Sequence, residues 1–577
     1  MESLLRESQK FIPSPEWLGP ALAAIAFHAA AQMVEIDLVV PYLAGAFVAA
    51  GAGILYVDVE MFSKPLSRAT SDLAASTAIF ALSLTTSIVV YRVFFHRLSR
   101  FPGPFAARVS RLHSVYKSIK HLQFHRELQQ LHEKHGDVVR IGPRDLSVAR
   151  VSALHPLAQC PKTVFYQQSN RDYRKVSMVA TRNLDDHRKR RRPWEQAMGM
   201  KELSRYNANI QSIVDVFLNQ IGQPEKVGKP FDVSERVYWL SYDLMGVIGY
   251  SRDFGNLKSS QEHAAVQNLR QAQVMLGYLK PVPWLINIMM SLPGASGAIA
   301  PFNEYCSQLV LDRQKALRKE KTEAPQDVVS WLLKAYEEKS PAAAQTKDAL
   351  DEDSRALVTG GADTAASTMI NALYYLATHP DAQAQLQRAV DDAMPDGEFE
   401  YNKIKDVPLL EAVINETLRL KPPVLSGNPR QTPPEGLRID DDLYLPGGVD
   451  VVVPQWVVHR DERYFERPNE FVPERWVAGS DKAGMLKDRR AWFPFQIGTF
   501  MCVGKQLAYW EMKSVLGRVA ARFDVTLAPG EDGKAFDEGF LDTFTMTVPS
   551  LLLINYTFDG YLKFGFWTLI SDEITFV

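Results

Sequence analysis

Three uncharged, apolar segments within the first hundred residues are the feature that most restricts what this chain can fold into. They cover about residues 17–34, 38–57 and 73–91, and each is close to the roughly 20 residues that cross a bilayer as a helix. Secretory signals are shorter and end in a cleavage site, so these segments are not one. We expect residues 1–99 to form a membrane region with up to three spans. An interfacial hairpin is the alternative for the first two segments, which Ala and Gly dilute.

Arginines cluster directly after the third segment, at positions 92, 97, 100, 108 and 111. Positive charge beside a span favours the cytosolic side of a membrane, so the chain that follows is predicted to lie in the cytosol. The sequence Phe101-Pro102-Gly103-Pro104 stops any helix. We therefore place a domain boundary at about residue 100.

The rest of the chain predicts one large domain from residue 100 to 555, mainly α-helical with small peripheral β-sheets. A hairpin is expected where residues 138–141 and 146–151 flank a turn, and two further short runs at 437–453 are separated by a Pro-Gly-Gly turn. The pattern between and after them is helical. A net charge of −2 over 577 residues indicates no bulk affinity for nucleic acid.

Cys502 is the residue whose surroundings most suggest chemistry. It lies between two glycines, directly before a helical pattern that begins at Lys505. A helix N-terminus favours a thiolate, and a thiolate can bind haem iron. A free cysteine is more often a small buried hydrophobic residue, so both interpretations stand for Cys502 alone. The other cysteines, Cys160 and Cys306, have no CxxC or HxxxH motif nearby, which argues against zinc and against a disulfide framework.

A long helix predicted over residues 351–377 carries two glycines at its centre, in Gly360-Gly361-Ala362-Asp363-Thr364. Each glycine costs about 1 kcal/mol against alanine, so we expect it to have a purpose. Gly361 and Thr364 share a face, which predicts a groove beside a hydroxyl, with Asp363 next to it. Such a groove suits a small diatomic ligand and a proton relay. The alternative is that the glycines admit a crossing helix.

Glu416 and Arg419 are three residues apart on a predicted helix that prolines end. A surface pair of this kind contributes little. Apolar neighbours indicate that the pair is partly buried, where a charge requires partners. Arg475, in the sequence Pro-Glu-Arg-Trp, is available to complete a network.

These motifs together resemble those of the cytochrome P-450 haem-thiolate monooxygenases. The Gly-Gly-x-Asp-Thr groove, the Glu-x-x-Arg helix, the Pro-Glu-Arg-Trp turn and the Cys-bearing loop follow that family's order and spacing from about residue 101 to 555. The resemblance implies the cytochrome P-450 fold and haem b, with Cys502 as axial iron ligand and with Phe495 and Gly498 in the cofactor-binding loop. It also implies that Thr364 and Asp363 serve proton delivery. Glu416, Arg419 and Arg475 would form a structural network.

The basic run at residues 187–192 resembles the family's helix that holds the haem propionates. His187 and Arg191 are four residues apart on one face and would contact the propionates. The other basic residues of the run could present positive charge to an acidic electron donor, although such a run is otherwise a solvated face. Arg430 resembles a further propionate contact.

Phe500 departs from the family pattern, since most members carry a basic residue two positions before the cysteine. The missing hydrogen bond to a propionate corresponds to roughly 1.5–3 kcal/mol, so haem retention must depend more on His187, Arg191 and Arg430. An aromatic residue here resembles a fungal subset, the tryprostatin-type hydroxylases. The tail at residues 556–577 extends beyond the usual family end.

The function implied by the resemblance is a monooxygenase that activates dioxygen and hydroxylates or otherwise oxidises a lipophilic small molecule in fungal secondary metabolism. Apolar segments near residues 273–285, 360–364, 424–427 and 545–548 are expected to line the distal pocket. No nicotinamide or flavin fingerprint is present, so NADPH would act through a separate membrane-bound reductase. The expected location is the endoplasmic reticulum membrane, with the catalytic domain in the cytosol.

Two alternative functions remain open. One is an enzyme of the same fold that rearranges peroxides or uses them directly, against which the presence of Asp363 and Thr364 argues. The other is a degenerate, haem-free membrane protein, for which Phe500 is the only support.

Overall fold

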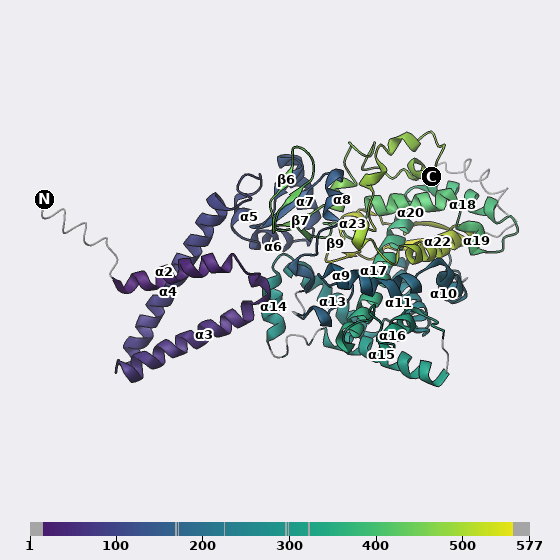
Figure 1. Ribbon diagram of the computed structural model, residues 1–577. Coiled ribbons are helices and arrows are strands. Elements are labelled where there is room, and N and C mark those ends of the chain that lie inside the picture. The colour runs from purple at the N-terminus through teal and green to yellow at the C-terminus, as the bar shows by residue number, and fades with distance from the viewer. Residues whose placement is uncertain are drawn as a thin grey trace.

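The computed structural model describes residues 15–557, apart from 168–169, 171, 224–225, 293, 295–296, 298 and 321–323. Three N-terminal helices project from a larger body, which is mainly helical and carries small sheets (Figure 1). The predicted fold class is confirmed.

The projecting helices are α2 (Pro15–Ala31), α3 (Val40–Tyr56) and α4 (Leu66–Val90). With the π-helical turns that continue α3 and α4, two helices, Val40–Met61 and Leu66–Phe95, are long and apolar enough to cross a membrane. Their most apolar windows contain no buried residues. The helix α2 packs along α4 and is shorter, with its apolar part at Leu18–Ala31. The number of spans stays a prediction.

The turn between α2 and α3 contacts the helical body through its acidic side chains. Arg182 donates from both terminal nitrogens to the Glu35 carboxylate, with both distances 2.7 Å. Asp37 lies 3.7 Å from the Arg111 guanidinium, which also pairs with two further aspartates. Arg111, part of the arginine cluster after the third apolar segment, is therefore ion-paired inside the protein.

The long helix α17 (Lys347–Thr378) passes through the core of the body, and its predicted span 351–377 lies within it. It ends at Thr378 because Pro380 disfavours a helical backbone at the residue before it, and His379 is indeed non-helical, with φ −129° and ψ 76°. The helices α10, α11, α20 and α22 pack around this core.

The helices of the body have the following bounds: α5 (Phe105–Val109), α6 (Leu112–Ser118), α7 (Phe124–His135), α8 (Leu154–Leu157), α9 (Leu184–Ala197), α10 (Met200–Ile221), α11 (Val233–Tyr250), α12 (Asn256–Ser259), α13 (Ala264–Leu279), α14 (Pro283–Ser291), α15 (Ala300–Glu320), α16 (Val328–Glu337), α18 (Pro380–Ala393), α19 (Tyr401–Ile404), α20 (Pro408–Leu420), α21 (Gln455–Val458), α22 (Lys505–Arg522) and α23 (Lys534–Glu538).

The main sheet has four strands in the order β1-β2-β7-β4. The strands are β1 (Val138–Arg140), β2 (Asp145–Val148), β3 (Phe231–Asp232), β4 (Arg430–Gln431), β5 (Leu437–Arg438), β6 (Tyr444–Leu445), β7 (Asp450–Val452), β8 (Phe523–Leu527), β9 (Leu541–Asp542), β10 (Met546–Thr547) and β11 (Leu552–Thr557). The predicted hairpin is confirmed as the antiparallel pair β1 and β2. The two runs around the Pro-Gly-Gly turn are strands, but they pair apart: β6 joins β5, and β7 joins β2 and β4.

The predicted C-terminal tail begins inside a strand rather than after one. Tyr556 is paired with Asp524 in β11, which ends at Thr557. The remainder of the tail lies outside the described residues.

Candidate active site

A cavity of about 290 Å³ is lined by the centre of α17 and by the loop before α22. Cys502 belongs to this lining, and so does Thr364. Apolar side chains such as Leu357, Val424 and Leu507 complete much of the wall. The structure therefore brings the candidate metal ligand and the candidate proton-delivery hydroxyl to one apolar cavity.

Two local features fix the loop that carries Cys502. The Cys502 N–H donates to the Phe495 carbonyl at 2.8 Å, which closes the loop. Gly498 has φ +65°, and a Cβ added there would lie 2.9 Å from the Ala158 Cβ, so only glycine fits. Phe495 lines the cavity, whereas Gly498 is absent from its lining and shapes the loop instead.

The Cys502 side chain is exposed toward the cavity although it lies deep within the protein. Burial raises the pKa of its thiol, against the opposing effects of the Gly504 N–H and the Arg191 and Lys505 charges. This direction is opposite to the sequence-based expectation of a thiolate at a helix end. Metal coordination would itself deprotonate such a thiol.

The two glycines of α17 have different roles. A Cβ on Gly361 would lie 2.1 Å from the Met245 sulfur of α11, so this glycine admits the crossing helix. A Cβ on Gly360 would meet nothing within 4 Å, and this residue opens onto the cavity. Gly361 lines the cavity as well, together with Thr364, so the predicted groove and the crossing helix meet at this one glycine. The Thr364 hydroxyl donates to the Gly360 carbonyl at 2.8 Å.

Asp363 is buried away from the cavity, although it is the sequence neighbour of Thr364 and was predicted to act with it in proton delivery. Its carboxylate accepts from the Tyr242 hydroxyl at 2.8 Å and from the Gln273 amide at 2.7 Å. Burial raises the pKa of Asp363, and these two hydrogen bonds oppose the shift only in part. The structure thus separates the two residues expected to share proton delivery.

His187, Arg191 and Arg430 line one side of the cavity together. Burial, and then the nearby Lys162 charge, lowers the pKa of His187 to about 4, so the imidazole is neutral at pH 7. Its ring nitrogens lie 3.0 Å from the Met178 carbonyl and 3.2 Å from the Thr499 carbonyl. A neutral imidazole has one N–H, so it serves as a hydrogen-bond donor and carries no charge.

The two arginines remain the charged members of this predicted set. Arg191 donates to the Met501 carbonyl at 2.6 Å and to the exposed Glu195 at 2.7 Å. The Arg430 guanidinium lies 4.5 Å from the centre of the Phe500 ring. Three side chains from two distant parts of the chain therefore form a wall that suits an anion.

Lys162 and Tyr166 also line this wall, and the sequence reasoning did not find them. Lys162 forms an isolated antiparallel β-bridge with Arg430, which places the two residues side by side. Tyr166 donates from its hydroxyl to Asn428 at 3.0 Å. A lysine inside the short, mostly apolar stretch at residues 161–166 could have indicated a buried functional group. The residues that it and Tyr166 contact, Arg430 and Asn428, are far along the chain.

Most of the segments predicted to line the distal pocket contribute to this cavity, among them Val424 and Thr545. The segment 273–285 does not. Its residues Gly277, Lys280 and Pro283 line a second cavity of about 130 Å³.

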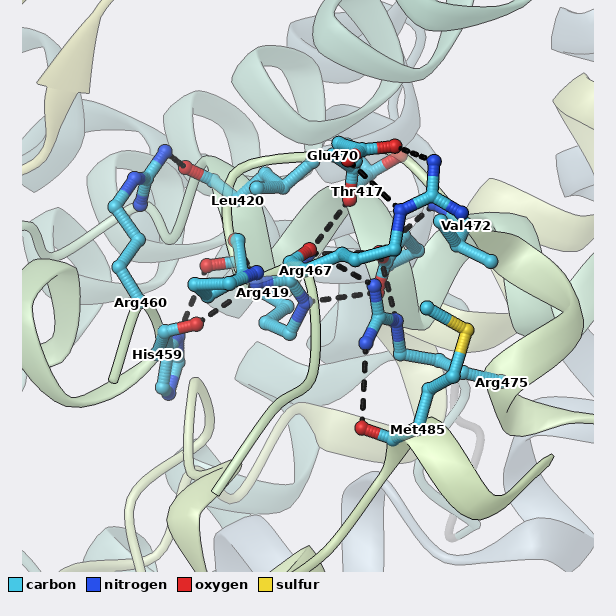
Figure 2. Close-up of polar contacts among 12 residues, drawn as sticks. Thr417, Arg419, Leu420, His459, Arg460, Arg467, Glu470, Val472, Arg475 and Met485 are labelled. Atoms are coloured by element: carbon cyan, nitrogen blue, oxygen red, sulfur yellow. Dashed lines mark hydrogen bonds and ion pairs between the residues drawn. The ribbon is translucent and has the colours of Figure 1, made fainter. Parts of the chain in front are cut away.

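Glu416, Arg419 and Arg475 form a fully buried network, and Figure 2 shows its two arginines, Arg419 and Arg475. Both Glu416 oxygens accept from Arg419 at 2.8 Å, and one also accepts from Arg475 at 3.1 Å. The arginines donate hydrogen bonds from their other N–H groups to backbone carbonyls, including those of His459 and Met485. Burial alone would raise the pKa of Glu416, but the two guanidiniums outweigh it and hold the pKa below its usual value.

Comparison with known proteins places this geometry in a family. The profile of the Cytochrome P450 family matches residues 102–554. The chain is 32% identical over 528 residues to Cytochrome P450 monooxygenase FCK2 of Fusarium pseudograminearum, covering 90% of this chain and 93% of the relative. It is 36% identical to Cytochrome P450 monooxygenase sthD of Phaeosphaeria nodorum, covering 80% and 95%. It is also 30% identical to Tryprostatin B 6-hydroxylase of Aspergillus fumigatus, covering 84% and 85%.

Proposed function

This chain belongs to the cytochrome P450 family and is a monooxygenase, an oxidoreductase, and we propose that it acts in fungal secondary metabolism. From this premise we propose that it binds haem b through Cys502 and oxidises a lipophilic small molecule in the cavity that Cys502 and Thr364 line. The observation that carries the proposal is this shared cavity, which has a sulfur ligand in one wall and a hydroxyl in another.

The residues around the cavity fit a haem. Cys502 offers the sulfur ligand, and Gly360 leaves open space at the opposite element. Arg191, Arg430 and the neutral His187 would hold the propionates. Glu511 is the acidic residue in the lining of the described cavity, and burial raises its pKa well above the usual value, so it adds no negative charge. When bound, the haem supplies the redox chemistry that activates dioxygen.

The chain's own contribution is to exclude water, position the substrate and deliver protons. The apolar wall selects a lipophilic substrate, because polar groups buried there would lose their hydrogen bonds. The Thr364 hydroxyl is placed to pass a proton into the cavity. Asp363 would join this delivery by exchanging protons through the groups around it, since it lies outside the lining.

Electrons would come from NADPH through a separate membrane-bound reductase. Arg188, Lys189 and Arg192 are exposed on α9, the helix that carries His187 and Arg191 toward the cavity. Positive charge there suits an acidic partner. Two apolar N-terminal helices are consistent with membrane anchoring. We propose the endoplasmic reticulum membrane as the site, with the body in the cytosol.

The proposal is tested by replacing Cys502 with alanine in the full-length protein. We expect Cys502→Ala to lose thiolate-ligated haem in the absorption spectrum. The matched control is Cys160→Ala, which removes another cysteine outside this cavity and should keep the spectrum. An unchanged spectrum in Cys502→Ala would contradict the proposal.

A further inference from the structure

Lys162 is a buried cation in the cavity wall. Only 4% of the residue is exposed. Its ammonium group donates to the Val179 carbonyl at 2.6 Å and reaches the Met178 carbonyl at 3.5 Å. The β-bridge to Arg430 and the shared cavity bring its charge next to that guanidinium.

No carboxylate forms an ion pair with Lys162 among the residues that the structure describes. Most of the charges that act on it are cations: burial first, and then Arg430, Arg190 and Arg191, lower the pKa of Lys162 well below that of a free lysine, and the Asp186 carboxylate, the last and smallest of these influences, opposes them only in part. A buried charge without a counter-ion is costly. This arrangement is therefore complete only when an anion enters the cavity.

Phe500 lies at the centre of this cationic wall. Its ring centre is 4.5 Å from the Lys162 nitrogen and 4.5 Å from the Arg430 guanidinium, and 4.7 Å from the His187 ring. A cation–π contact of this kind contributes about 0.5–2 kcal/mol, which is less than the several kcal/mol that burying a lone ion costs. The ring can therefore orient both cations but cannot replace an anion.

We propose that Lys162 binds a haem propionate and takes over the role of the basic residue that Phe500 replaces, while the Phe500 ring positions Lys162 and Arg430 for this contact. The inference rests on the proposed function, because it assumes a bound haem. The competing explanation is that Lys162 only ties the segment at Met178 and Val179 to the wall.

The test measures how fast haem leaves the purified full-length holoprotein when excess apomyoglobin is present as acceptor. Loss of a charge-assisted hydrogen bond should make haem transfer from Lys162→Gln about ten- to a hundred-fold faster. Lys162→Arg keeps the charge and should stay close to the wild-type rate. A wild-type rate in Lys162→Gln would overturn the proposal.

Lys421 offers a matched control. It is also buried, with 2% exposure, and its ammonium lies 4.0 Å from the Phe540 ring, but it pairs with Asp537 and does not line the cavity. Lys421→Gln removes a buried lysine that contacts the Phe540 ring, outside the cavity. Its haem transfer should match wild type, and an acceleration equal to that of Lys162→Gln would overturn the proposal in favour of a general loss of stability.

Two variants of Phe500 separate propionate binding from a structural tie. Adding Phe500→Arg to Lys162→Gln restores a basic residue and should slow haem transfer again, which a lost tie to Val179 would not allow. Phe500→Leu removes no buried charge and should accelerate transfer by roughly two- to thirty-fold, the equivalent of one cation–π contact. Absence of both effects would contradict the positioning role of the ring.

The outcomes also distinguish this inference from the proposed function. Wild-type protein without thiolate-ligated haem would overturn the proposed function. Wild-type protein with that haem, together with unchanged haem transfer in Lys162→Gln, would overturn only the role of Lys162.

Discussion

Thr364 is the side chain that we expect to pass protons into the cavity. Its hydroxyl already donates to the Gly360 carbonyl at 2.8 Å, so its oxygen is free to accept from a solvent or substrate group in the cavity. Asp363, held by Tyr242 and Gln273, faces another environment. We therefore expect proton delivery to depend first on the hydroxyl.

Replacement of Thr364 by alanine should leave haem content unchanged and divert electrons from product to hydrogen peroxide. Loss of a hydroxyl that takes part in a proton relay lowers the rate of a proton-dependent step by about a hundred-fold or more. The measurement is hydrogen peroxide released per NADPH oxidised, with reductase and a lipophilic substrate found by spectral titration.

The control for that variant is Thr359→Ala. Thr359 lies one and a half turns earlier on α17 and makes the same kind of bond, to the Arg355 carbonyl at 2.9 Å, but does not line the cavity. Equal peroxide release from Thr364→Ala and wild type would remove Thr364 from proton delivery.

His459 gives a pH dependence of stability. Burial, followed by the Arg419 charge, lowers its pKa from 6.5 to about 3. At a pH between these values, His459 is protonated in the unfolded chain but not in the folded protein, so the free energy of unfolding falls as the pH falls. The loss from this one group is about 2 kcal/mol between pH 6.5 and 5.

The melting temperature of His459→Gln should therefore fall less than that of wild type when the pH is lowered from 7 to 5. The comparison uses this difference, because the substitution also changes stability at every pH. His121→Gln, at an exposed position, should behave like wild type. An equal drop in His459→Gln and wild type would show that His459 does not supply this pH dependence.

Single residues differed in how well the sequence predicted them. Cys502, Thr364, His187, Arg191 and Arg430 were selected from local motifs, and all five line one cavity. Lys162 and Tyr166 stand in no such motif, because Lys162 is placed by a β-bridge to Arg430 and Tyr166 by a hydrogen bond to Asn428, both far along the chain. The buried position of Asp363 was also missed, since spacing on a helix does not reveal its partners on other helices.

At the scale of elements, the network around α20 holds residues 472–476, a later segment of the chain, against this helix. Glu416 accepts from Arg419, Arg475, the Trp476 indole and the Val472 N–H. Every partner is supplied by α20 or by residues 472–476. The sequence predicted the three charged residues, but not the backbone carbonyls that complete their hydrogen bonds.

Glu416→Gln should destabilise the protein by about 3–5 kcal/mol, because it leaves two buried guanidiniums without a counter-ion. The measurement is the free energy of unfolding in urea, or the yield of folded holoprotein where the variant does not survive purification. Glu470 forms an exposed pair with Arg467 beside the network (Figure 2). Glu470→Gln should leave the free energy of unfolding close to the wild-type value, because solvent screens an exposed ion pair, and equal losses in both variants would contradict a structural role for the Glu416 network.

Elements themselves were predicted well where the pattern was local. The span of α17 and the hairpin of β1 and β2 followed from periodicity and turn residues. The pairing of β7 with β2 did not, because it joins strands that lie far apart in the chain. The pairing of β7 with β4 did not either, because the hairpin of β5 and β6 lies between them in the chain.

At the scale of the whole molecule, an apolar N-terminal region projects from a helical body (Figure 1). Residues of this body line the cavity. Apolar segments and the Pro-Gly-Pro boundary predicted this division. The contacts between the parts were not predictable: Glu35 reaches Arg182, whose Nε also donates to the Lys162 carbonyl at 3.0 Å. The turn between α2 and α3 thus supports the cationic wall from outside.

The central claim is that Cys502 presents its sulfur to a haem in this cavity. The most direct measurement is the difference spectrum of the purified, reduced full-length protein with and without carbon monoxide. We predict a Soret band at the long wavelength typical of thiolate ligation. A Soret band at the shorter wavelength of a haem without thiolate, or no band at all, would contradict the claim.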